Sequence, residues 1–182
     1  METDFGNRLL GGERILWQGV PQSGILFTPR DALLIPFSFM WFGFAIFWEW
    51  SVITQANAPD FFTLWGIPFV LIGLYMAVGR FFADAWLRGR TSYAVTTQRI
   101  LILRSPPFGS FTAMAVDRLP ELSLIERSDG RGTIRFQPNT PVFGRGNGFG
   151  SWMPSLDATQ FLMIREARNV FDIIQKAGAK AA

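Results

Sequence analysis

The pattern of apolar and polar residues divides the chain into two parts. From residue 31 to residue 79 there is no Lys or Arg. Phe and Trp recur throughout this stretch, and its only acidic residues are Asp31, Glu49 and Asp60. A soluble domain would need more polar residues to shield so much apolar surface from water, whereas lipid accepts it.

Two apolar runs lie within this stretch, at about 32–53 and 61–79, with the polar segment 54–60 between them. Each has the roughly 20 residues that a helix needs to cross a hydrocarbon layer about 30 Å thick. The alternative is a pair of helices buried in a soluble core. That is disfavoured because both runs are apolar on every face, more than a chain of 182 residues would bury. The sequence therefore predicts a transmembrane helical hairpin over residues 29–83.

The start of the first helix has recognisable signals. Thr28 suits the N-cap, Pro29 the first helical position and Asp31 the acidic position of a capping box. Pro36 is expected to bend the helix. Glu49, near its far end, is interpreted as interfacial, and the alternative is a buried functional carboxylate.

Basic residues flank the hairpin on both sides and are absent from its turn, so both termini are expected on the cytoplasmic side of the membrane. Residues 80–182 contain 14 Lys or Arg against 8 Asp or Glu. Setting the topology would explain Arg80, Arg88 and Arg90. Binding to anionic lipid is the alternative, and the candidate headgroup contacts are Arg80, Arg88, Arg90, Arg99 and Arg104.

The remaining residues, 88–182, have the texture of a small β-rich domain. Residues 91–104 predict two strands joined at Thr97-Gln98, and 110–117 predict another. Residues 122–137 predict a hairpin that turns at Asp129-Gly130. Apolar residues spaced three and four apart predict a C-terminal amphipathic helix over about 155–177, with its apolar stripe on the sheet. The predicted fold class is an α+β membrane protein: a two-helix hairpin plus a small antiparallel β domain capped by this helix.

Three short motifs, in this order, resemble the bacterial membrane-anchored pleckstrin-homology-like proteins. They are GERILWQGVPQ (12–22) before the hairpin, YAVTTQRILIL (93–103) after it, and GRGTIRF (130–136) ahead of the terminal helix. The resemblance implies a split β-barrel or sandwich closed by the C-terminal helix. It also implies that residues 1–28 add a strand to the domain. The Gly-rich insert 141–154 departs from the family pattern.

Little in the sequence indicates catalysis. There is no Cys and no His, which removes thiolate chemistry, the usual general base and the commonest metal ligand. The glycines of 144–150 alternate strictly and do not fit a nucleotide-binding motif. No acidic pair is spaced for acid–base work. We therefore expect no enzyme activity, no catalytic, cofactor or metal residues, and no binding to nucleic acid.

Exposed aromatic side chains favour an interaction protein instead. The insert has apolar residues that would dip into the membrane, dock on a partner or tuck under the domain's own sheet. The candidate partner contacts are Trp41, Trp48, Trp65, Phe149, Trp152 and Met153. The sequence predicts a non-catalytic accessory subunit or assembly factor of a larger membrane complex, with other integral membrane subunits or a second copy as partners. A sensor of anionic lipid headgroups is the alternative, and a membrane enzyme or transporter is a third.

Overall fold

A computed structural model describes residues 5–28, 31–55, 60–119, 121–136 and 159–181. The chain forms two compact units. One is made of residues 25–84 and is helical. The other combines residues 1–24 with residues 85–182 and contains the strands. The fold is thus α+β, with two long apolar helices and antiparallel sheets.

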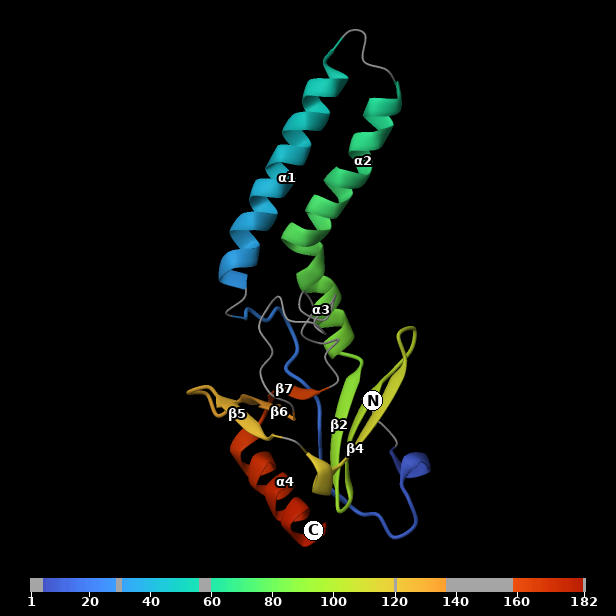
Figure 1. Cartoon of the computed structure of the whole chain (residues 1–182), viewed down its shortest axis with the longest axis vertical. Coiled ribbons are helices and arrows are strands. Elements are labelled where there is room, and N and C mark those ends of the chain that lie inside the picture. The colour runs from blue at the N-terminus through green and yellow to red at the C-terminus, as the bar shows by residue number, and fades with distance from the viewer. Residues whose placement is uncertain (1–4, 29–30, 56–59, 120, 137–158, 182) are drawn as a thin grey trace. The chain divides into compact units, whose positions relative to one another are not determined.

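The helical unit is an antiparallel hairpin (Figure 1). Helix α1 is Asp31–Ile53 and helix α2 is Asp60–Leu74. A π-helical turn, η2 (Tyr75–Gly79), joins α2 to α3 (Arg80–Arg88), and the boundary between the units falls inside α3. Asp31–Ile53 and Leu64–Arg88 are both long and apolar enough to cross a membrane. The second membrane-spanning helix was expected to end near residue 79, where the apolar run ends. The helix instead continues to Arg88, because residues beyond the apolar run are also helical.

Two glycines of α2 bring the two helices close together. A Cβ at Gly73 would lie 3.0 Å from Phe42 Cα, and a Cβ at Gly66 would lie 2.7 Å from Trp48 Cζ3. Gly66 and Gly73 are seven residues apart, two helical turns, so both face α1. Small residues at a helix contact are typical of membrane packing, where close approach of the backbones supplies much of the attraction.

The second unit contains two antiparallel sheets. The first has the order β1-β2-β3-β4, and the second has the order β5-β6-β7. Between β4 and β5 lies the short helix η3 (Val116–Arg118), and η1 (Gly6–Arg8) precedes β1. The strand bounds are Ile15–Gly19, Thr91–Thr96, Arg99–Arg104, Ser110–Ala115, Ser123–Glu126, Gly132–Arg135 and Gln160–Ile164 for β1 to β7 in turn.

Strand β1 precedes the hairpin in the sequence, and β2 follows the hairpin. The two strands pair, with Trp17 opposite Val95. Alternate residues of β2 and β3 face opposite sides of the first sheet, as the period of a strand requires. Tyr93 and Ile100 face the main core, whereas Ala94 and Leu101 face the other side, where Phe5 covers them. Both sides of these strands are therefore buried.

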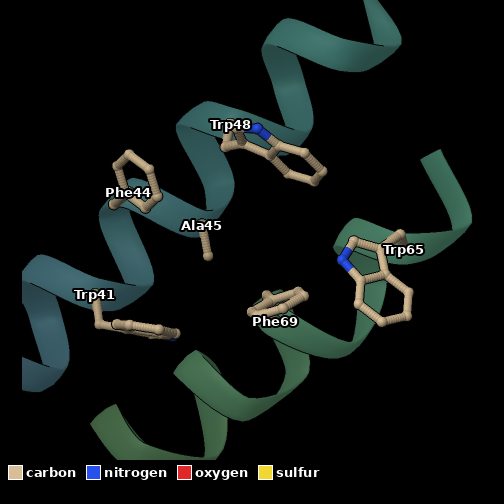
Figure 2. A pocket seen from close by; sticks show the side chains of 6 residues that line it. All are labelled: Trp41, Phe44, Ala45, Trp48, Trp65 and Phe69. Atoms are coloured by element: carbon tan, nitrogen blue, oxygen red, sulfur yellow. The ribbon is translucent and has the colours of Figure 1, made fainter. Parts of the chain in front are cut away.

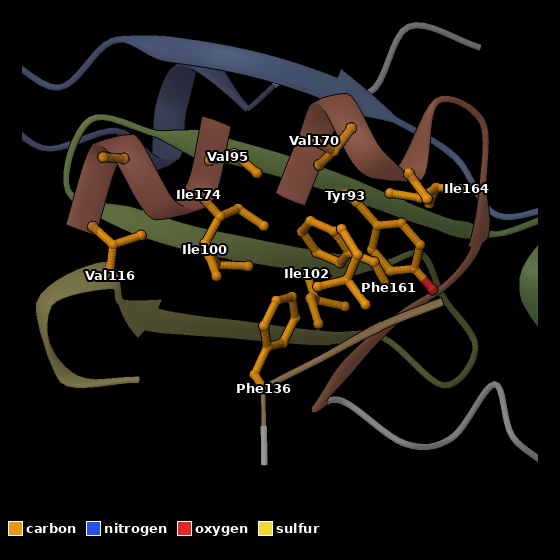
Figure 3. Close-up of a cluster of buried hydrophobic side chains, with 13 residues drawn as sticks. Tyr93, Val95, Ile100, Ile102, Val116, Phe136, Phe161, Ile164, Val170 and Ile174 are labelled. Carbon is orange, nitrogen blue, oxygen red and sulfur yellow. The ribbon is translucent and has the colours of Figure 1, made fainter. Parts of the chain in front are cut away.

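Helix α4 (Ala167–Ala181) and the two sheets enclose the main core (Figure 3). Phe161 is at its centre. Its ring stacks on Tyr93, with centroids 4.5 Å apart, and meets Phe136 edge to face at 5.0 Å. Val170 and Ile174 supply the apolar stripe of α4, which confirms that the terminal helix packs on the sheet.

The expected start of the C-terminal helix was wrong. Residues 160–164 form strand β7, and α4 begins only at Ala167; residues 155–158 lie outside the described part of the chain. Phe161, Ile164 and Ala167 have helical spacing, but the run from Phe161 to Ile164 is apolar without interruption. Such a run is also what a strand buried on both faces requires. The helix also continues beyond the expected end near residue 177, to Ala181.

Candidate functional site

The arginines predicted to contact lipid headgroups have different environments, and four of them are bound within the protein. Arg80 lies at the start of α3 and its Nη2 is 2.8 Å from Oδ1 of Asp31, the first residue of α1. Both side chains are buried. The other Asp31 carboxylate oxygen accepts hydrogen bonds from the backbone N–H and the hydroxyl of Thr28, at 2.6 and 2.8 Å. Asp31 therefore makes one of the two bonds of the predicted capping box, the one to the Thr28 N–H, and ties the two ends of the hairpin together.

Arg88, at the end of α3, is almost fully buried. It donates hydrogen bonds to two backbone carbonyls of the segment before the hairpin, Gln22 O at 3.0 Å and Gly24 O at 2.6 Å. Arg104, at the end of β3, is also buried, and this burial lowers the pKa of its guanidinium. Neither side chain presents its charge at the surface.

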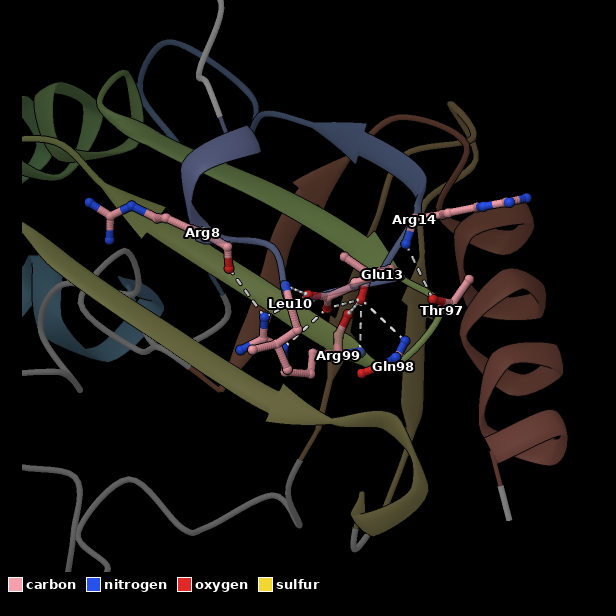
Figure 4. A network of polar contacts seen from close by, with 8 residues as sticks. Arg8, Leu10, Glu13, Arg14, Thr97, Gln98 and Arg99 are labelled. Carbon is pink, nitrogen blue, oxygen red and sulfur yellow. Dashed lines mark hydrogen bonds and ion pairs between the residues drawn. The ribbon is translucent and has the colours of Figure 1, made fainter.

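Arg99 belongs to a polar network that holds the N-terminal segment on the first sheet (Figure 4). Its Nη2 lies 2.6 Å from Glu13 Oε2, and its Nε donates to Glu13 Oε1 at 3.1 Å. The Thr96 hydroxyl and the Leu10 N–H also donate to this carboxylate. Burial alone would raise the pKa of Glu13, but these hydrogen bonds, above all that from Arg99, outweigh it and lower the pKa to about 2.

Arg90 has a different environment from the other four. It follows α3 and is only partly buried, and its guanidinium carbon lies 3.9 Å from the centre of the Trp86 ring. The Trp86 ring in turn meets Phe108 edge to face, with centroids 6.4 Å apart. Trp86 is 40% exposed and Phe108 63% exposed. Phe108 could not be predicted as part of this site, because its contact with Trp86 joins residues that are distant in the sequence.

The candidate partner contacts of the hairpin lie together. Trp41, Trp48 and Trp65 all line one cavity of about 200 Å³ between α1 and α2 (Figure 2). Phe44, Ala45 and Phe69 complete the lining. The other three candidate contacts, Phe149, Trp152 and Met153, lie outside the described residues, as do the glycines of 144–150.

Glu49 turns toward α2 beside this cavity. A Cβ on Gly66 would collide with both its carboxylate and the Trp48 ring, so Gly66 makes room for them. In the part of the chain that the structure describes, Glu49 Oε2 is buried with no hydrogen-bond partner. Across those same residues, no three acidic side chains gather closely enough to hold a metal ion.

No protein-family model matches this sequence, no curated protein is similar to it, and no solved structure matches it. The function of this chain is therefore inferred from its own geometry.

Proposed function

We propose that the protein is a membrane-anchored, pleckstrin-homology-like accessory subunit or assembly factor of a larger complex in the bacterial inner membrane. It performs no chemistry itself. The hairpin spans the bilayer, both termini are cytoplasmic, and the domain formed around the two sheets holds the protein's cytoplasmic contacts. A four-stranded and a three-stranded antiparallel sheet closed by a C-terminal helix support the likeness to that family.

The observation that carries the proposal is the aromatic surface of the hairpin. Phe44 and Trp65 are exposed by 64% and 54%, and they line the same cavity as Trp41 and Trp48. Large, rigid rings around a hollow give a neighbouring helix a shaped surface to fill, and Trp is among the residues most enriched at such contacts. We expect a transmembrane helix of another subunit to pack there.

The test compares the rings that line the cavity with an exposed residue of α1 outside it. The double variant Trp41→Leu/Trp65→Leu removes rings from the cavity, whereas Phe47→Leu alters a residue of α1 that is 67% exposed and does not line it. Each protein is purified from its native membrane in mild detergent, and the partners are identified by mass spectrometry. We expect the wild type and Phe47→Leu to retain the same integral membrane partner and the double variant to lose it. A wild-type protein that purifies alone, or a double variant that retains the partner, contradicts the proposal.

A sensor of anionic lipid is the second candidate, and the position of Arg90 favours it. The other four arginines are bound within the protein, whereas the partly buried Arg90 lies over an exposed Trp ring. In nanodiscs with and without phosphatidylglycerol, the full-length protein would then be more stable with the anionic lipid. Arg90→Gln would remove that difference, and Arg118→Gln, which changes an exposed arginine beside Asp117, would not.

A further inference from the structure

We infer that the loop between β3 and β4 is a second membrane contact, in which Phe108 inserts into the headgroup layer beside Trp86 and Arg90. This inference rests on the proposed membrane anchor. The loop would contact lipid in addition to the hairpin, and its binding partner would be an anionic phospholipid bilayer.

The loop is held against the end of α3 by backbone contacts. Helix α3 ends at Arg88 with the Arg90 N–H donating to Leu87 O at 3.1 Å. The Ser105 N–H then donates to Arg90 O at 2.9 Å. These bonds fix the first residue of the loop beside the residue that follows the helix. The ring contact between Trp86 and Phe108 thus lies close to a backbone contact between the same two segments.

The composition of the loop suits an apolar surrounding. Pro106 and Pro107 have no backbone N–H, so this turn has fewer polar groups to desolvate when it leaves water. Trp86, Arg90 and Phe108 form one surface patch. Phe108 is the most exposed of the three, at 63%. A large apolar side chain held out beside two residues that lack N–H donors is an arrangement that a lipid surface accepts.

The polar side of the patch supplies the charge complementarity. Trp has an apolar ring with one N–H donor and is enriched where hydrocarbon meets headgroups. The Arg90 guanidinium lies over that ring and carries a fixed positive charge that fits a lipid phosphate. Trp86 is six residues after Arg80 on the same helix, which continues the apolar span of α2. In the sequence, Trp86 and Arg90 therefore directly follow the segment proposed to lie in lipid.

The test uses the absence of native cysteine. Single cysteines at three exposed apolar positions, Phe108→Cys, Ile125→Cys and Phe44→Cys, are each labelled with an environment-sensitive fluorophore. Ile125 lies on β5, in the same unit as Phe108, and Phe44 lies on α1. The full-length proteins are placed in nanodiscs of phosphatidylcholine with phosphatidylglycerol. Quenching is measured with aqueous iodide and with lipids carrying a nitroxide near the headgroup or deep in the acyl chain.

We expect the label at 108 to be quenched by the shallow nitroxide and to be several-fold less sensitive to iodide than the label at 125. The label at 44 should respond to the deep nitroxide. Arg90→Gln should weaken the shallow quenching at 108 when phosphatidylglycerol is present and change it little in phosphatidylcholine alone. Unchanged melting of each labelled protein shows that it has folded.

Three results would overturn the inference in different ways. If the label at 108 matches that at 125 while the label at 44 stays lipid-quenched, the loop does not touch the membrane although the anchor stands. If the labels at 44 and 108 both respond only to iodide, the anchor itself fails. If the label at 108 is shielded from every quencher, protein and not lipid covers Phe108.

Discussion

At the scale of single residues, this protein holds Arg80, Arg88, Arg99 and Arg104 in its interior or in internal polar contacts. Arg80, Arg88 and Arg99 each join segments that are far apart in the sequence. A guanidinium can join such segments because its several N–H donors bind more than one acceptor and it stays charged at any physiological pH. The sequence predicted that these arginines matter near the membrane, but their partners were beyond prediction because each lies dozens of residues away.

The Glu13–Arg99 pair makes stability depend on acid. Because the folded-state pKa of Glu13 is about 2, below the ordinary 4.5, the unfolded chain binds the proton first as pH falls. The stabilisation is fully present above pH 4.5 and is lost between pH 4.5 and 2, amounting to about 3 kcal/mol. Glu13→Gln should show that loss already at neutral pH, measured by denaturant unfolding.

Glu126→Gln is the matched control, because Glu126 pairs with Arg168 at 3.4 Å on the exposed surface. Such a pair contributes about 0–1 kcal/mol, so this variant should unfold like the wild type. If both variants lose the same free energy of unfolding, the Glu13 network stabilises the protein no more than an exposed ion pair does.

The buried pair of Asp31 and Arg80 predicts strong coupling between two substitutions. Asp31→Asn leaves the buried guanidinium without its counter-charge and should destabilise the hairpin by about 3 kcal/mol. Arg80→Met should do the same to the carboxylate. The double variant should lose clearly less than the sum of the two, as measured by unfolding in detergent. Additive losses would show that the two side chains do not interact.

At the scale of elements, the hairpin and the strands were predictable because their signals are local. Apolar length specified α1 and α2, and the turns at Thr97-Gln98 and Asp129-Gly130 separated neighbouring strands. Strand β7 was missed because its burial on every side depends on β6 and α4, which the local pattern does not reveal. The same limit applies to the cluster of Trp86, Arg90 and Phe108.

The contact of α1 with α2 predicts that substitutions at two glycines destabilise the hairpin to different degrees. Gly73→Leu forces a side chain toward the Phe42 backbone, so it should separate the helices and cost about 1–3 kcal/mol. Gly43→Leu places the same side chain where nothing lies within 4 Å of the new Cβ, and it should cost little. Unfolding in detergent, with cross-linking across the hairpin, measures both. Equal effects at the two positions would mean that the helices do not pack closely at Gly73.

At the scale of the whole molecule, the domain that contains the sheets is discontinuous in sequence. Residues 1–24 and 85–182 form one unit, and the hairpin is inserted between β1 and β2. The short motifs predicted this arrangement only through their resemblance to a family. Strand β1 alone has too little buried apolar sequence to indicate its partner, since three of its five residues are exposed and it forms an edge of the sheet.

The pairing of β1 with β2 also restricts how the chain is made and inserted. The two paired strands must share one aqueous compartment, so a hairpin between them that spans a membrane must cross it an even number of times. During synthesis β1 leaves the ribosome first and has no neighbour to bond with until the whole hairpin has been translated. Completion of the sheet therefore waits until the whole hairpin has been synthesised.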